Sequence, residues 1–295
     1  MGKLIFYIVD VFAEEKYAGN QLAVVRDATA LSDSQMQKIT KEMNYSETTF
    51  IMSEEPREGG YDVRIFTPAA EVPFAGHPTL GTAFVIRQEI VKQPIETINL
   101  NLKVGQIPVT FEREKNRNEL LWMKQIEPVF GQNIEAGVIA QILGLERSEI
   151  DERFPIEEVS TGLPHIIVPL KNLDAVGRSI IAKDKYFKLV NDRWAKAILI
   201  FCPQTSCREN ALRVRVFGDY YGVPEDPATG SGNGCLAGYL VKHRYFGTSK
   251  IDIRVEQGHE IGRPSLLYLR AEEKSDHIDV SVGGKVIMIA EGKLF

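Results

Sequence analysis

Apolar residues along this chain come in short runs that predict β-strands. In each run they either alternate with polar residues or continue unbroken, and β-branched and aromatic residues are frequent. Turn residues, such as the pair Gly19-Asn20, separate one run from the next. The strands expected in the first half span residues 4–12, 21–26, 48–52, 61–66, 96–104, 107–113 and 119–124.

Other segments show the period of a helix. Residues 32–43 carry apolar side chains at helical spacing behind Ser32, which is the expected N-cap. Another helix is expected at 134–143. The remaining two, 78–88 and 233–241, contain few charged residues, and this pattern indicates helices that are buried on all sides.

The second half of the chain repeats the first. Residues 63–73 (VRIFTPAAEVP) match 214–224 (VRVFGDYYGVP) at a constant offset of 151 positions, and a glycine-bearing turn and an apolar helix follow each. Residues 18–25 (AGNQLAVV) also resemble residues 161–168 (TGLPHIIV). Because three matches occur in the same order, we infer a duplicated unit of about 150 residues.

This duplication predicts two domains. We expect the seam near 125–135 and therefore place the domains at 1–127 and 128–295, with the last strand as a candidate to pack back on the first domain. The cleft between two homologous halves is the usual place for a ligand site. A purely structural duplication without an active cleft is the alternative.

Composition and charge narrow the class of protein. The 295 residues are 44% hydrophobic and 25% charged, as in a soluble globular protein. A formal net charge of −5 without a basic cluster favours neither a nucleic-acid nor a membrane partner. No apolar run reaches the ~20 residues that span a bilayer. Three cysteines and a strand-like start predict a cytoplasmic protein.

Two strand-to-helix junctions at corresponding points of the repeat are candidates for ligand binding. The first contains Gly76 and His77, and the second contains Gly230, Ser231 and Gly232. Glycines allow backbone N–H groups to approach a ligand, and the first N–H groups of a helix carry the positive end of its dipole. Together the junctions would hold a carboxylate or a developing enolate. The alternative is that they are ordinary caps and turns.

Three titratable residues are candidates for the chemistry. The helix dipole is expected to lower the pKa of His77 and keep its ring neutral, although a structural histidine is the alternative. Glu47 precedes an apolar strand, where desolvation would raise its pKa towards that of a general acid/base, unless it is simply exposed. Asp226 is either a helix N-cap or a second carboxylate in the cleft. No histidines or cysteines have metal-ligand spacing, so no metal is expected.

In combination, these segments closely resemble the PhzF family of phenazine-biosynthesis-like isomerases, which shares the duplicated fold of diaminopimelate epimerase. The resemblance covers nearly the whole chain. It implies an α+β fold in which each half is a mixed β-sheet rolled into a barrel around a central helix, with the active site between the halves, and it implies a homodimer. The segments that carry it are VDVF, AGNQLAVV, SETTF, RIFTPAAEVPFAGHPTLG, EDPATGSGNGCLAGYL and QGHEIGRPS.

The resemblance also assigns roles to individual residues. Glu47 matches the catalytic acid/base of the family, and His77 and Asp226 match further active-site groups. The substrate-binding residues that it implies are Gly76, Ser231, Gly230 and Gly232. The epimerase relatives carry two cysteines at the helix starts, whereas His77 and Ser231 occupy those positions here and Cys235 lies deeper in its helix. This departure disfavours two-thiol racemisation.

The function expected from the resemblance is a cofactor-independent isomerase. It would move a proton on a small carboxylate-bearing metabolite, with Glu47 as a single acid/base and neither metal nor organic cofactor. One alternative is an amino-acid racemase or epimerase with Cys235 as a base. The other is a non-catalytic metabolite-binding protein of the same fold.

Overall fold

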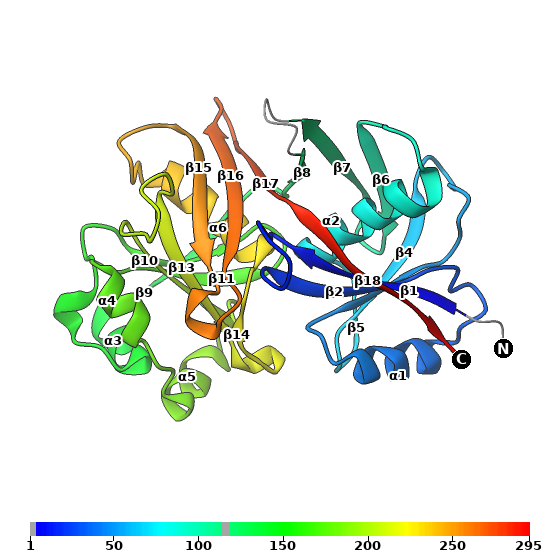
Figure 1. Cartoon of the computed structure of the whole chain (residues 1–295). Coiled ribbons are helices and arrows are strands. Elements are labelled where there is room, and N and C mark those ends of the chain that lie inside the picture. Colours follow the sequence, from blue (N-terminus) through cyan, green and yellow to red (C-terminus); the bar gives the residue numbers. More distant parts are fainter. Residues whose placement is uncertain (1–3, 114–118) are drawn as a thin grey trace. The chain divides into compact units, whose positions relative to one another are not determined.

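The structure, a computed structural model, describes residues 4–113 and 119–295 (Figure 1). The chain forms two compact units. Unit 1 contains the described residues up to Lys124 together with Gly283–Phe295, and unit 2 is Gln125–Val282. The seam therefore lies at 124/125, where the sequence suggested 127/128, and the C-terminal segment returns to unit 1.

Unit 1 is a mixed sheet with two α-helices. The strands follow the order β18–β1–β2–β3–β4–β6–β7–β8, and the pairs β2–β3 and β4–β6 are parallel whereas the other pairs are antiparallel. β5 pairs with β4. The elements are β1 (Leu4–Val11), β2 (Asn20–Val25), α1 (Asp33–Met43), β3 (Thr48–Ile51), β4 (Tyr61–Phe66), β5 (Glu71–Val72), α2 (Gly76–Val85), the π-helical η1 (Ile86–Val91), β6 (Thr97–Leu102), β7 (Gly105–Arg113), β8 (Glu119–Lys124) and β18 (Val286–Leu294).

Unit 2 has the same kind of sheet with further helices. Its strands follow the order β9–β10–β11–β12–β13–β15–β16, and β14 pairs with β13. The elements are β9 (Val129–Ile134), α3 (Ala136–Leu143), η2 (Arg147–Glu149), β10 (Ile156–Ser160), β11 (Pro164–Pro169), α4 (Leu173–Arg178), α5 (Lys183–Val190), β12 (Ala197–Cys202), β13 (Leu212–Gly218), η3 (Asp219–Tyr221), β14 (Val223–Asp226), α6 (Gly230–Lys242), β15 (Lys250–Gln257), η4 (His259–Ile261), β16 (Ser265–Glu273) and β17 (Ile278–Gly284).

The pairing pattern of the two units confirms the predicted duplication. The antiparallel pair β1–β2 corresponds to β10–β11, the parallel pair β2–β3 to β11–β12, and the parallel pair β4–β6 to β13–β15. The matching segments 63–73 and 214–224 lie on β4–β5 and β13–β14. The repeat in the sequence is therefore a repeat in topology.

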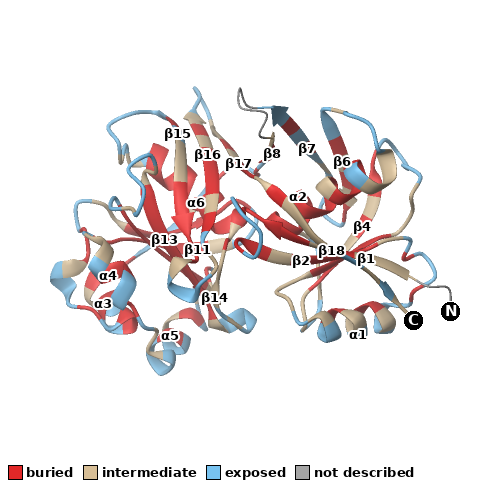
Figure 2. Cartoon of the chain, in the orientation of Figure 1, coloured by how far each residue is buried: buried red, intermediate tan, exposed pale blue. Residues whose placement is uncertain are grey.

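One helix in each unit is buried along almost its whole length, as the sequence predicts (Figure 2). In α2 only Phe84 is partly exposed, and in α6 every residue from Gly230 to Val241 is buried. Small residues allow this packing, because a Cβ at Gly81 would lie 2.6 Å from Leu22 Cδ2. No helix among the described residues is both long and apolar enough to cross a bilayer.

Two helix starts test the boundaries expected from the sequence. α1 begins as predicted, because Ser32 is its N-cap and forms a capping box with Gln35. α2 begins at Gly76, two residues earlier than expected. Pro78 is compatible with this start, since a residue in the first turn needs no N–H donor. After Val85 the helix continues as the π-helical turn η1.

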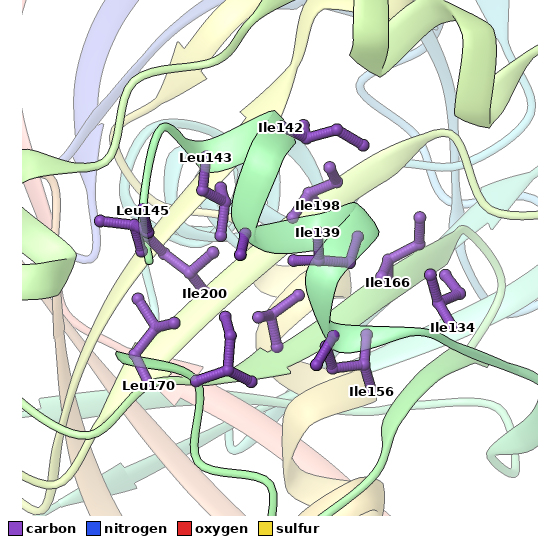
Figure 3. Close-up of a cluster of buried hydrophobic side chains, with 14 of the residues drawn as sticks. Ile134, Ile139, Ile142, Leu143, Leu145, Ile156, Ile166, Leu170, Ile198 and Ile200 are labelled. Carbon is purple, nitrogen blue, oxygen red and sulfur yellow. The ribbon is translucent and has the colours of Figure 1, made fainter. Parts of the chain in front are cut away.

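Helix α3 covers an aliphatic core in unit 2 (Figure 3). Ile139 is fully buried, whereas its neighbour Val138 is 42% exposed. The buried face of α3 therefore packs on apolar side chains of the sheet. The labelled members of this cluster are Ile134, Ile139, Ile142, Leu143, Leu145, Ile156, Ile166, Leu170, Ile198 and Ile200.

This packing predicts a contrast between neighbouring truncations. Ile139→Ala should lower the free energy of unfolding by about 2–5 kcal/mol, because it leaves a cavity in the core. Val138→Ala should change it by less than about 0.5 kcal/mol, because the side chain is already solvated. Urea titrations of the two variants measure the difference. Equal losses of stability would contradict the packing of α3.

Candidate active site

Glu47 and His77 meet within unit 1. Glu47 directly precedes β3, and His77 is the second residue of α2. Oε2 of Glu47 lies 3.5 Å from Nε2 of His77, and both atoms are buried. The side chain of His77 is 6% exposed and that of Glu47 is 19% exposed. The desolvation that the sequence suggested for Glu47 is therefore present, although part of the side chain remains accessible.

A second contact lies close to this one, between β3 and α2. Residues 47 and 49 lie on one side of the strand, because side chains alternate along β-structure. Thr49 Oγ1 lies 2.7 Å from Thr82 Oγ1 in a buried hydrogen bond. Both contacts therefore join this segment of the chain to α2.

His77 is neutral in this environment. Burial lowers the pKa of His77 to about 3, against a smaller opposing effect of a hydrogen bond with the Gln21 backbone. The pKa is lowered, as the sequence suggested, but the largest cause is burial and not the helix dipole. Nε2 makes no hydrogen bond to any residue that the structure describes. Nε2 of a neutral ring can accept a hydrogen bond, and the carboxyl group of Glu47 can donate one to it when protonated.

The second predicted junction lies in unit 2, at the start of α6. Gly230, Ser231 and Gly232 form the first turn, and all three residues are buried. Thr229 is the N-cap residue, and its side chain makes no capping hydrogen bond. Asp226 is the last residue of β14, and its Oδ2 accepts a hydrogen bond of 2.5 Å from Thr229 Oγ1. The structure thus excludes Asp226 as the N-cap, which was one of its two expected roles.

Sequence reasoning missed the role of Gln257 at this junction. Its side chain is fully buried and bonds to Asp226, Thr229 and Asn233. A signal was present in β15, where Ile251, Ile253 and Val255 alternate towards one face and Gln257 continues the series. A polar residue at a position that alternation assigns to the apolar face marks a buried hydrogen-bonding site.

Cys235 lies in the interior of α6 beside a second buried histidine. Its Sγ is 3.8 Å from Nδ1 of His165. Burial raises the pKa of Cys235 to about 11 and lowers that of His165 to about 4, so both groups are neutral near pH 7. His165 also explains Gly232, because a Cβ there would lie 3.1 Å from His165 Nε2. A neutral, fully buried thiol is poorly suited to remove a proton from carbon.

The predicted site residues thus form two groups. The structure brings Glu47 and His77 together beside Gly76 at the start of α2. It brings Asp226 to the start of α6, where the other substrate-binding candidates lie. That both groups act on one ligand stays a prediction. Among the residues that the structure describes, no three His, Cys, Asp or Glu side chains are grouped so that they could hold a metal ion.

Comparison with known proteins decides the family. The model of the phenazine biosynthesis-like proteins (PhzC-PhzF) matches residues 9–292. The chain belongs to this family. It is 35% identical to the trans-2,3-dihydro-3-hydroxyanthranilate isomerase of Pseudomonas aeruginosa, over 98% of this chain and 99% of that protein. This PhzF-like chain is therefore an isomerase.

Solved structures support the same assignment. The PhzF-family protein of Bacillus anthracis superposes with a TM-score of 0.92 at 25% identity, and the match covers 100% of both chains. A probable proline racemase from Agrobacterium radiobacter superposes with a TM-score of 0.65 at 9% identity, over 99% of this chain and 93% of that one, and this likeness shows the fold alone. The expected α+β fold of the diaminopimelate epimerase type is confirmed.

The burial of two histidines makes a prediction for nuclear magnetic resonance. At about pH 5.5 the rings of His77 and His165 should be neutral, because burial lowers the pKa of both. His277 should be protonated, because Asp276 raises its pKa. Ring nitrogen shifts measured from pH 7.5 to 4.5 distinguish the two states. A midpoint for His77 near the ordinary histidine value would contradict the buried geometry.

The same shifts predict how stability depends on pH. In the unfolded chain both histidines bind protons as the pH falls through about 6.5, whereas in the folded chain they do so only near pH 4 and 3. The unfolded state therefore binds more protons in this window. Stability from these groups is complete above about pH 6.5 and decreases as the pH falls below it.

Proposed function

We propose that this chain moves a proton between two carbon atoms of a small carboxylate-bearing metabolite, with Glu47 as the acid/base. The observation that carries the proposal is the contact between Glu47 and His77. It pairs a partly desolvated carboxyl group with a neutral imidazole that offers a hydrogen-bond acceptor. Such a carboxyl group has a defined position both before and after it takes up a proton.

The proposed steps conserve atoms and electrons. The Glu47 carboxylate removes a proton from a carbon next to a conjugated or carboxylate-bearing group, and the C–H electron pair shifts into that system. Protonated Glu47 donates a hydrogen bond to Nε2 of His77 while it holds the proton. It then delivers the proton to another carbon, where a new C–H bond forms and the double bond has moved. The sequence of steps consumes no oxidant, reductant or cofactor.

Charge that develops on the substrate needs stabilisation during these steps. We assign this to the backbone N–H groups at the starts of α2 and α6, whose N-cap side chains make no capping hydrogen bond. Asp226 and Ser231 are proposed to hold the substrate. Because the curated relative named above acts on trans-2,3-dihydro-3-hydroxyanthranilate, this compound is the first substrate to test.

Replacement of the acid/base tests the proposal directly. Glu47→Gln keeps the shape of the side chain but accepts no proton from carbon. It should abolish turnover and the exchange of substrate hydrogen with heavy water, while affinity changes by less than about tenfold, or about 1.4 kcal/mol. Turnover, isotope exchange and ligand affinity are measured on the same preparation of each variant.

Cys235→Ala serves as the matched comparison. Because the thiol is buried and neutral, this variant should retain turnover close to that of the unmodified protein. The racemase alternative, with Cys235 as a base, predicts the opposite order. An active Glu47→Gln variant together with an inactive Cys235→Ala variant would overturn the assignment of Glu47.

A further inference from the structure

We propose that Gln257 is a positioning residue, which fixes the direction of the hydrogen bond between Thr229 and Asp226. The inference rests on the proposed function, because Asp226 is assigned there to the substrate. Gln257 lies at the end of β15, and its side chain reaches from there to the start of α6. It is fully buried. Its hydrogen bonds determine which polar atoms at the start of α6 act as donors and which act as acceptors.

Backbone groups of known polarity fix the orientation of the Gln257 amide. Nε2 lies 2.7 Å from the carbonyl oxygen of Asp226, which only accepts, so this atom is the donating nitrogen. Oε1 lies 3.2 Å from the N–H of Thr229, which only donates. The side-chain nitrogen of Asn233 also donates to Oε1, at 2.8 Å. A flipped amide would oppose all three contacts.

This orientation decides the direction of the next bond. The second N–H of Gln257 points to Thr229 Oγ1 at 3.1 Å, so the hydroxyl oxygen accepts there. The hydroxyl proton is then directed to Asp226 Oδ2, 2.5 Å away. The hydrogen bonds therefore run in one direction, from Gln257 through Thr229 to Asp226. They hold the carboxylate as an acceptor at Oδ2 and restrict its rotation.

The repeat supplies an internal comparison. Val63 and Val214 are matched in the two halves, and β13 pairs with β15 through Val214 and Gln257. The corresponding parallel pairing of β4 with β6 joins Tyr61 to Leu100 and Asp62 to Asn101, and one more residue in the same register brings Val63 to Leu102, the last residue of β6. Unit 1 therefore has an apolar side chain where unit 2 has the amide. The fold itself does not need the amide, and its presence coincides with the carboxylate at this junction.

A different contact already holds the start of α6. The side-chain nitrogen of Asn233 donates to the carbonyl oxygen of Thr229 at 3.0 Å. Thr79 makes the same contact at the start of α2, where its Oγ1 donates to Ala75 O at 2.7 Å. Because α2 begins without a counterpart of Gln257, we assign the glutamine to the carboxylate and not to the helix.

Three variants test this assignment. Gln257→Glu removes both N–H donors at almost constant shape, Thr229→Val removes the hydroxyl, and Thr229→Ser retains it. With trans-2,3-dihydro-3-hydroxyanthranilate, the first two should lower kcat by about tenfold to a hundredfold through misorientation of Asp226, with KM changed by less than about threefold. Thr229→Ser should restore kcat. The double variant of Gln257→Glu and Thr229→Val should be no slower than the slower single variant.

A measurement without substrate separates this inference from the proposed function. In protein with labelled threonine, the Thr229 hydroxyl proton should exchange slowly and correlate with its own Cβ. Gln257→Glu should abolish that signal. Gln37→Glu is the matched control, because Gln37 also donates to two backbone carbonyls, at 2.9 and 3.1 Å, and does not contact Asp226. The control should retain both the signal and kcat.

The outcomes are decisive in both directions. A hydroxyl signal unchanged by Gln257→Glu, or a normal kcat in both Gln257→Glu and Thr229→Val, overturns the positioning role. If the unmodified protein turns over no substrate, the proposed function fails, whereas the hydroxyl signal still decides the inference. Should Gln257→Glu not fold, Thr229→Val and Thr229→Ser carry the test, because both keep the amide of Gln257.

Discussion

Helices α2 and α6 are buried along almost their whole length. This burial restricts which side chains the helices can carry and which polar groups must find partners inside each unit. A helix with packed neighbours on every side has no face for charged or bulky side chains, so glycines and other small residues line it. Its first N–H groups also lie in a dry environment, where polar groups need partners. Gln257 meets part of this need, because its Oε1 accepts a hydrogen bond from the N–H of Thr229, the N-cap residue of α6. The other N–H groups at these helix starts are the ones that we propose bind the substrate.

The two units share a topology but carry different chemistry at equivalent positions. With segment 18–25 matched to 161–168, the pairing of β2 with β3 and of β11 with β12 makes Ala197 the counterpart of Glu47. Ser231 is likewise the counterpart of His77 as the second residue of its helix. The acid/base candidate therefore belongs to unit 1 alone. A duplicated scaffold supplies two helix starts, and substitutions at matching positions make their roles distinct.

Burial also decides which groups near these helices are charged. His77, His165 and Cys235 are all held neutral, because desolvation disfavours their charged forms. This distribution fits proton transfer by one carboxyl group better than transfer between two thiols.

The sequence by itself determined the repeat, the strands and the buried helices. These follow from hydrophobic period and from residue size, which are local properties, and the expected strand at 61–66 and the cap at Ser32 match the structure. The glycine-bearing turns at Gly76 and Gly230, where α2 and α6 begin, were also readable from adjacent residues.

The tertiary structure alone decided the partners of those residues. Glu47 and His77 are 30 positions apart, and Gln257 is 31 positions from Asp226, so their contacts depend on how strands pair and where helices begin. Local propensity favoured Asp226 as an N-cap, but α6 begins at Gly230, so Thr229 is the N-cap residue and Asp226 accepts a hydrogen bond from its hydroxyl group. Hydrogen bonds between distant residues carry no local signature, and only the packed chain specifies them.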